Sequence, residues 1–334
     1  MRAAIPTVAV LLFLPAADRA ADWQPLTTEL LAREKPGFGG LCGVVVDHGT
    51  GRVFVNVSDR GVFTSKDRGK TWDRLGNGPF KGRTEDPGCF LLDPTGKTNR
   101  LLLPLVYGVP ISLGNADRGD WRTLDKASTH VDWCAADWSD PQMKFLLSLK
   151  HESGGMLLVS RDGGKSFRDV GKGYGPAWVF DADTAVAARL KTKDNPKGGI
   201  VRTTDGGNTW KPAADFTPNP ITLPRWHDGV LYWLADGVLY KTADKGATWQ
   251  KAGTVKDGRY GPVFGKDAKH MFVLTGTGVV ESTDAGATWS PPIALPKAMK
   301  GGSGLSWLEY DPTADVLYVM RMGSELYALN RGWK

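Results

Sequence analysis

The chain has 334 residues, of which 41% are hydrophobic and 23% charged, and its formal net charge is +6. This composition is typical of a globular protein and excludes a disordered chain, a collagen, a coiled coil and a polytopic membrane protein. The basic residues are scattered singly, so we expect no nucleic-acid partner. The 42 glycines and 13 tryptophans favour many short strands joined by turns, with a large packing site that recurs.

The N-terminus has the pattern of an export signal. Arg2 is followed by an apolar stretch from Ala3 to Ala17, which is shorter than the roughly 20 residues that span a bilayer as a helix. A positive start, a short apolar core and small residues afterwards predict a secretory signal peptide over residues 1–20, cleaved between Ala17 and Ala21. We therefore expect a secreted or periplasmic protein with no stable membrane insertion after cleavage. An uncleaved anchor is the alternative.

A short motif recurs along the rest of the chain. Five segments share the pattern Ser/Thr-x-Asp-x-Gly-x-Ser/Thr-aromatic, beginning at Ser65, Ser160, Thr203, Thr242 and Ser282, and a weaker copy begins at Asn115. The Asp side chain can accept backbone N–H groups just ahead of it, and the Gly supplies the positive φ of a tight turn. The pattern predicts a structural hairpin turn rather than a catalytic carboxylate. The motif aspartates are Asp67, Asp117, Asp162, Asp205, Asp244 and Asp284.

The spacing of the motif predicts the fold. Successive motif aspartates lie 39 to 50 residues apart, which is the length of one four-stranded propeller blade. We expect an all-β fold, a seven-bladed β-propeller of four-stranded antiparallel blades, as a single domain over residues 21–334. The seventh unit, from Trp307 to Asn330, has three strands and no motif. Because the segment around Trp23 resembles the strand after each motif, the N-terminal strand should join the last blade and close the ring.

These motifs resemble the Asp-box, or BNR, repeats of sialidases and related propellers. The repeats cover essentially all of the chain after the signal, so the resemblance implies a propeller. The same repeat occurs in sialidases, xyloglucan-cleaving glycosidases, sortilin-type receptors and the seven-bladed photosystem II assembly factor. The resemblance therefore leaves a binding protein, a hydrolase and an assembly factor open.

The residues do not favour sialidase chemistry. The resemblance implies three arginines on the substrate carboxylate, a tyrosine nucleophile helped by a glutamate, and an aspartate acid/base. The early inner strand that begins at Gly39 has no arginine, and Glu309 and Tyr310 are strand neighbours that should face opposite sides. Another glycoside hydrolase would need two carboxylates beside the scissile bond. The weak candidates for those carboxylates are Asp132, Glu85 and Asp86.

The loops that link successive blades converge at one end of the channel, and we expect a binding site there. Arginine, aromatic and histidine side chains on such a face suit a protein partner or a sugar stacked on aromatic rings. The alternative for Trp133 and Trp226 is packing between blades. The candidate binding residues are Arg83, His130, Trp133, His151, Tyr174, Arg225, Trp226, His227, Arg259 and Tyr260.

Neither a cofactor nor a metal is expected. His130, Asp132, Cys134 and His151 come from one blade, but two-residue strand spacing is a poor tetrahedral clamp. Cys42, Cys89 and Cys134 each start an inner strand of the first three blades. Small buried side chains at a crowded centre are favoured for them, and a disulfide between adjacent strands is the alternative.

The sequence thus favours an exported, non-enzymatic binding or scaffold protein for a protein or glycan partner at the loop face. A sialidase-like or other glycoside hydrolase with a divergent active site is the alternative. An assembly-factor role rests on blade number alone.

Overall fold

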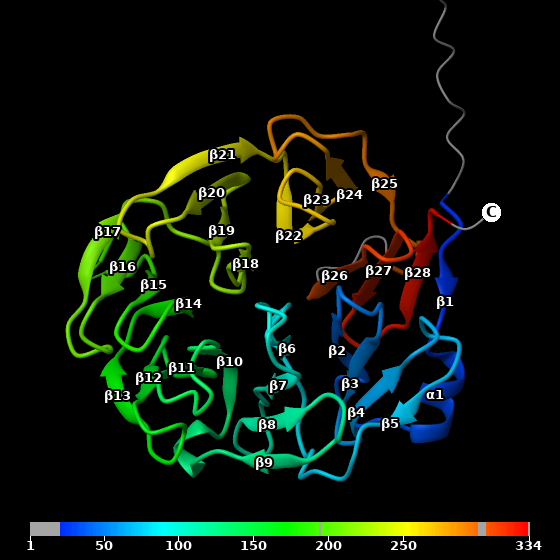
Figure 1. Ribbon diagram of the computed structural model, residues 1–334, viewed down its shortest axis with the longest axis horizontal. Helices are drawn as coiled ribbons and strands as arrows, with labels where there is room; N and C mark the ends of the chain where they lie inside the picture. Colours follow the sequence, from blue (N-terminus) through cyan, green and yellow to red (C-terminus); the bar gives the residue numbers. More distant parts are fainter. Residues whose placement is uncertain (1–20, 194, 300–304, 333–334) are drawn as a thin grey trace, which may run out of the picture.

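Seven four-stranded antiparallel sheets stand around a central channel, as the motif spacing predicts (Figure 1). The structure, a computed structural model, describes residues 21–193, 195–299 and 305–332, so the predicted signal peptide lies outside the described residues. Each sheet is a meander whose first strand lies at the channel, except that the last sheet takes its fourth strand from the N-terminus. The fold class is therefore confirmed.

The strands of the first four blades, in chain order, are β2–β5 (Leu41–Val46, Val53–Val57, Gly61–Ser65, Asp73–Arg74), β6–β9 (Leu91–Leu92, Arg100–Leu103, Ser112–Asn115, Trp121–Thr123), β10–β13 (Val131–Ala136, Leu146–Lys150, Leu157–Ser160, Arg168–Gly171) and β14–β17 (Tyr174–Val179, Ala185–Arg189, Gly199–Thr203, Lys211–Ala214). The remaining strands are β18–β21 (Arg225–His227, Val230–Ala235, Val238–Thr242, Gln250–Thr254), β22–β25 (Gly258–Phe264, Met271–Thr275, Gly278–Ser282, Ile293–Ala294), and β26–β28 (Ser306–Asp311, Val316–Arg321, Leu326–Asn330) with β1 (Gln24–Pro25). The described helices are α1 (Thr28–Glu34) and the 3-10 turns η1 (Lys126–Ser128) and η2 (Lys297–Met299).

The meander separates two faces of the ring. Every inner strand runs in the same direction along the channel, because each blade begins at the channel and alternates direction outward. The loops that lead into inner strands and those between second and third strands share one end, which we call the loop face. The hairpins that leave inner strands share the opposite end with the motif turns, and we call it the hairpin face.

The motif turns have the predicted hydrogen bonding. In the turn at Asp244, Oδ1 accepts from Thr242 Oγ1 at 2.8 Å and from the Thr248 N–H at 2.9 Å, and Oδ2 accepts from Thr248 Oγ1 at 2.6 Å. The N–H of Gly246, whose φ is +77°, donates to Thr242 Oγ1 at 3.0 Å. The turns at Asp67, Asp162, Asp205 and Asp284 repeat this pattern. These carboxylates are occupied by the turn itself, which supports a structural role.

The weaker copy of the motif works differently. Asn115 Oδ1 accepts the N–H groups of Asp117 and Arg118, both at 3.0 Å, and so takes the place that the Ser or Thr hydroxyl holds in the other motifs. Asp117 is exposed and forms an ion pair with Arg52 at 3.4 Å. Asp117 therefore links two neighbouring blades instead of closing its own turn.

The N-terminal strand closes the ring as expected. β1 pairs with β28 through Gln24 and Ala328, and Figure 1 shows the two strands side by side. Trp23, directly before β1, is 9% exposed, and its Nε1 donates to the Ala294 carbonyl of the sixth blade at 2.7 Å. The motif residue Trp121 contacts the blade before its own in the same way, donating to the Leu75 carbonyl at 2.9 Å. Ring closure thus reuses the packing of the repeats.

The cysteines and the helix complete the description. Cys42, Cys89 and Cys134 are buried free thiols, which confirms the favoured interpretation over a disulfide. Burial raises the pKa of Cys42 to about 12. α1 covers the closure region with Leu30 buried, and the described chain contains no helix with the length and apolar character to cross a bilayer.

Replacing Trp23 tests the closure. Trp23→Ala should lower the free energy of unfolding by about 3–5 kcal/mol, because a buried indole and its hydrogen bond between two blades are both lost. Trp23→Phe should recover a large part of this loss. Urea unfolding of the purified protein measures both. An effect of Trp23→Ala within 1 kcal/mol, on the order of an exposed substitution, would contradict the role given to this residue.

The motif turns should make the free energy of unfolding depend on pH in the acidic range. Partial burial opposes ionisation of Asp244, but hydrogen bonds from Thr248 and Thr242 outweigh it and lower the pKa to about 2. Because this folded-state pKa lies below the unfolded value, the stabilisation is complete above about pH 4 and disappears as the pH falls through 2. Asp244→Asn should lower the free energy of unfolding by on the order of 1 kcal/mol at pH 7, because solvent screens this exposed carboxylate. Near pH 1 the substitution should leave it unchanged. Thermal unfolding at both pH values, with the exposed Asp215→Asn as control, measures the difference.

Candidate functional site

Several predicted residues meet at the loop face between the first three blades. Arg83 lies between two exposed rings, with its guanidinium carbon 4.4 Å from the ring centre of Phe38 and 4.8 Å from that of Tyr107. Phe38 is 81% exposed and Tyr107 50% exposed, while Arg83 itself is buried and pairs with Glu85 at 2.8 Å. We call Phe38, Arg83 and Tyr107 the aromatic clamp. Its two rings were not predicted.

A histidine network continues from the aromatic clamp. The ring centres of His130 and His151 lie 4.8 Å apart, and that of Tyr107 lies 4.8 Å from His130 and 5.4 Å from His151. His151 Nδ1 donates to the Asp132 carboxylate, and its Nε2 lies 3.2 Å from the Tyr107 hydroxyl, which donates to Glu152 at 3.3 Å. His130 Nδ1 accepts the Tyr107 backbone N–H at 3.1 Å. The predicted residues His130, Asp132 and His151 thus belong to one hydrogen-bonded unit.

This network favours a binding surface over a metal site. His130, His151 and Glu152 bring possible ligand atoms within 4.8 Å of one another. However, the lone pair of His130 Nδ1 accepts the Tyr107 N–H, which leaves the ring proton on Nε2, and His151 Nε2 is already occupied. Desolvation and the neighbouring Glu152 raise the pKa of Tyr107, so its phenol stays protonated. Neither a ligand set nor a phenolate nucleophile is formed by these groups.

The weak catalytic candidates do not form a free pair of carboxylates. Glu85 is held by Arg83, and Asp132 by His151. Asp86 is buried, and burial together with the nearby Asp132 and Glu85 raises its pKa well above the usual value. A glycosidase needs one carboxylic acid and one carboxylate open to the scissile bond. Glu85 and Asp132 instead hold Arg83 and His151 in place at the loop face.

The other predicted loop-face residues have separate places. Trp133 is fully buried in β10, so the packing alternative holds for it. Tyr174 is buried beneath Arg189, whose guanidinium carbon is 4.2 Å from its ring centre. Arg259 pairs with Asp257 at 3.4 Å. Arg259 and the buried Tyr260 line a loop-face groove of about 670 Å³ together with the exposed Ile221.

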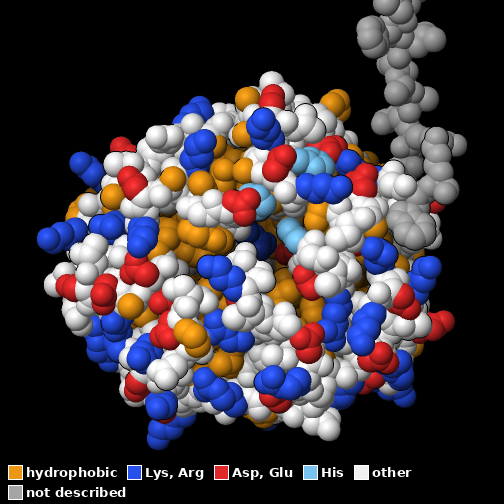
Figure 2. Space-filling view, in the orientation of Figure 1, with side chains coloured by type: hydrophobic (Ala, Val, Ile, Leu, Met, Phe, Trp, Pro, Cys, Tyr) orange, Lys and Arg blue, Asp and Glu red, His pale blue; other side chains and the backbone are white. Residues whose placement is uncertain are grey.

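Arg225, Trp226 and His227 correct the prediction, because they do not lie in a loop-face loop. They form β18, whose last pair joins His227 to Val230 across a two-residue turn at the hairpin face. The fifth blade has an inner strand of only three residues after a long loop, so these residues sit at the far end of the channel. There they line a cavity of about 220 Å³. Figure 2 shows this face, hollowed at its centre beside histidine and hydrophobic side chains.

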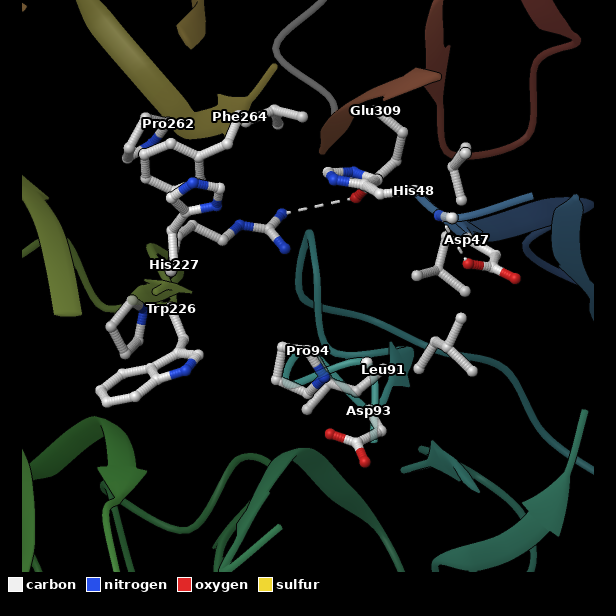
Figure 3. Close-up of a pocket in the computed structure, with 18 of the residues that line it drawn as sticks. Asp47, His48, Leu91, Asp93, Pro94, Trp226, His227, Pro262, Phe264 and Glu309 are labelled. Atoms are coloured by element: carbon white, nitrogen blue, oxygen red, sulfur yellow. Dashed lines mark hydrogen bonds and ion pairs between the residues drawn. The ribbon is translucent and has the colours of Figure 1, made fainter. Parts of the chain in front are cut away.

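A charge pair lies at the inner end of this cavity. Arg225 Nη2 is 3.7 Å from Glu309 Oε1, the ion pair drawn in Figure 3. The Tyr260 hydroxyl donates to the same oxygen at 3.3 Å, and the guanidinium carbon lies 4.6 Å from the Tyr260 ring centre. Tyr310 points away and packs on Phe272, as strand alternation predicts. The structure therefore forms a tyrosine–glutamate pair across two blades, which adjacency in the sequence could not show. One arginine joins it, in place of the three that the sialidase resemblance implies.

Burial shifts the titration of the cavity groups. It raises the pKa of Glu309 to about 7, although Arg225 and the Val46 N–H act to lower it. It lowers the pKa of His48 to about 4, with His227 and Arg225 adding to the effect. At neutral pH the imidazole of His48 is therefore uncharged, and Glu309 is divided between its acid and carboxylate forms.

Flat side chains form the cavity walls. Trp226 stacks on Trp178 with ring centres 5.8 Å apart and planes 13° from parallel, and His227 stacks on Phe264 at 4.4 Å. Figure 3 shows Trp226, His227 and Phe264 on one side of the cavity, with His48 and Asp47 across from them. Trp226 therefore packs between blades, which was the alternative to a binding role, and it also borders the cavity.

No known protein family and no curated protein matches the sequence. Among solved structures the chain is similar to YCF48 from Cyanidioschyzon merolae, with 12% identity, a TM-score of 0.53, and 93% of this chain and 99% of that chain covered. The structure of YCF48 bound to D1 peptide has 14% identity and a TM-score of 0.52, and the match covers 93% of this chain and 95% of that chain. An ancestral GH74 enzyme has 17% identity and a TM-score of 0.50, and the match covers 91% of this chain and 46% of that chain. At these identities the similarities show the propeller fold.

The buried carboxyl group gives a stability test. The folded-state pKa of Glu309, about 7, lies above the unfolded value of 4.5, so stability should fall as the pH rises through this window. Between pH 5 and pH 8 the free energy of unfolding should fall less in Glu309→Gln than in the wild type, by on the order of 3 kcal/mol. Urea unfolding at the two pH values measures it, with the exposed Glu29→Gln as control. A Glu309→Gln protein with the pH dependence of the wild type would disprove the shift.

Proposed function

We propose that this protein is an exported, non-enzymatic propeller of the Asp-box type that binds a protein partner at its loop face. The aromatic clamp is the observation that carries the proposal. An arginine between two exposed aromatic rings is the composition typical of residues that dominate protein interfaces. Export rests on the N-terminal sequence pattern and the Asp-box type on the turn motifs.

The distribution of exposed apolar side chains supports the choice of face. The large hydrophobic side chains that are exposed among the described residues are Phe38, Tyr107 and Ile221. Phe38 and Ile221 lie in loops that lead into inner strands, and Tyr107 lies between the second and third strands of its blade, so all three belong to the loop face. A partner that covers the loop face would therefore cover all three side chains.

The aromatic clamp is also prepared for binding. Arg83 is held by Glu85, and the Tyr107 hydroxyl is held by His151 and by Glu152 at 3.3 Å. Side chains fixed before binding lose little conformational entropy in the complex. The similar propeller YCF48 is found with a D1 peptide, which supports a peptide segment as the partner. A glycan stacked on the rings is the second ligand class that such a surface suits.

Peptide display tests this function. A random peptide library is selected on the wild-type protein alone, and the enriched peptides are synthesised and tested on the wild type, on Phe38→Ala, on Tyr107→Ala and on the double variant. They should bind the wild type and lose at least tenfold in affinity on either single substitution, since central aromatic contacts contribute about 2 kcal/mol or more. Fluorescence anisotropy measures the affinities.

Ile221→Ala is the matched control, because it truncates an exposed hydrophobic side chain of the same face outside the aromatic clamp. It should leave the affinities unchanged. Peptides that bind the double variant as well as the wild type would contradict the proposed surface. Hydrolysis of fluorogenic glycosides by the wild type, abolished by Asp132→Ala or Glu85→Ala, would overturn the non-enzymatic assignment.

A further inference from the structure

Arg225 at the inner end of the hairpin-face cavity has unused hydrogen-bonding capacity. Among the described residues, its Nε and Nη2 are buried and find no hydrogen-bond acceptor. The 3.7 Å between Nη2 and Glu309 is an ion-pair distance, longer than a hydrogen bond. A buried donor without an acceptor destabilises the fold, and more strongly when the donor is charged. The Arg225 side chain as a whole is 17% exposed, and the residue lines the cavity.

The other acidic groups of the cavity are already satisfied. Asp93 accepts from the N–H and hydroxyl groups of both Thr95 and Thr98, at 2.6 to 3.0 Å. Asp47 accepts from the Gly49 N–H and the Thr50 hydroxyl in its own turn. Glu309 is therefore the carboxyl group that faces Arg225. When it is protonated, the inner end of the cavity carries an uncompensated positive charge.

The cavity has the size and shape for a small planar group. Its volume of about 220 Å³ corresponds to the share of about seven waters in liquid water. Trp226 and the His227–Phe264 stack provide flat walls, and an adjoining groove of about 360 Å³ continues past Trp226 to Trp138 and Phe180. A ring or an apolar side chain would stack on these walls while a charged end reaches Arg225.

We propose that this cavity binds a ligand that carries a carboxylate beside a flat apolar group, as a small aromatic acid or as the C-terminal residue of a peptide. The guanidinium of Arg225 supplies paired N–H donors for the carboxylate, which is the geometry that carboxylates prefer. Trp226 supplies the stacking surface. This site lies at the opposite end of the channel from the proposed protein-binding surface, and it does not depend on that proposal.

Binding should be coupled to the protonation of Glu309. An ionised Glu309 competes with the ligand for Arg225, so the protein with neutral Glu309 is the competent form. With a pKa of about 7, the apparent affinity for a carboxylate should fall about tenfold between pH 6 and pH 8. The titratable and charged groups that face the pair are His48 and Asp47 from the first blade, Asp93 and Cys89 from the second, His227 from the fifth and Tyr260 from the sixth.

Calorimetric titration of the purified full-length protein tests the site with two pairs of probes. Indole-3-acetate is compared with its neutral amide, and the free acid of the peptide Gly-Gly-Trp with its C-terminal amide. At least one acid should bind at pH 6, at least tenfold more tightly than its amide. Preference for the indole acid or for the peptide acid distinguishes the two sources of the carboxylate. Failure of both acids to bind, or equal binding of acids and amides, would overturn the proposal.

Substitutions assign the binding to the cavity. Arg225→Gln should lower the affinity for the acid probe at least tenfold. Trp226→Ala, at the cavity wall, should lower this affinity severalfold. Glu309→Gln keeps the shape of the side chain without the charge, so it should bind at pH 8 about ten times more tightly than the wild type and show no pH dependence. If Arg225→Gln does not fold, Glu309→Gln still decides, because an unchanged pH profile would refute the coupling. Phe38→Ala, at the loop face, should bind the acid like the wild type.

Discussion

An indole N–H that donates to a carbonyl of the preceding blade joins neighbouring blades at three boundaries among the described residues, and the closure of the ring depends on one of them. Trp121 donates to the Leu75 carbonyl and Trp72 to that of Leu26, in each case reaching back to the neighbouring outer strand. Trp23 makes the same contact with Ala294, although it belongs to no motif. A sheet edge left unpaired would be a site for aggregation, and this contact holds β1 where it covers the last edge. The same local chemistry therefore builds the blades and joins the two ends of the chain.

The fold could be predicted because its determinants are local and repeated. Each motif contains its own donors and acceptors within a few residues, as the turn from Thr242 to Thr248 shows, so the interaction does not depend on the rest of the fold. Because the motif recurs at the length of one propeller blade, few repeat architectures are compatible with the sequence. The N-terminal strand was predicted from the similarity of the segment around Trp23 to the strands after the motifs.

The candidate sites were predicted only in part, because they join residues that are distant in the sequence. Arg83, His130 and His151 were predicted as loop-face residues and lie there, but Phe38 and Tyr107 lie in irregular loops where no period marks them. Arg225 was placed at the wrong end because the length of β18 depends on the loop before it. Glu309 meets Tyr260 only after two blades pack together. Contacts between blades have no signature in the spacing of the motif.

The uniform direction of the inner strands explains why two unlike surfaces can coexist. The loop face carries exposed rings held by a hydrogen-bonded network, whereas the hairpin face carries a recessed charge pair between flat walls. A buried ion pair with imperfect hydrogen bonding is weak support for a fold, since apolar side chains of similar volume would usually serve stability as well or better. Arg225 and Glu309 are therefore better explained by what they can bind than by what they hold together. Since four-stranded sheets lie between the two faces, a ligand at one end need not disturb the other.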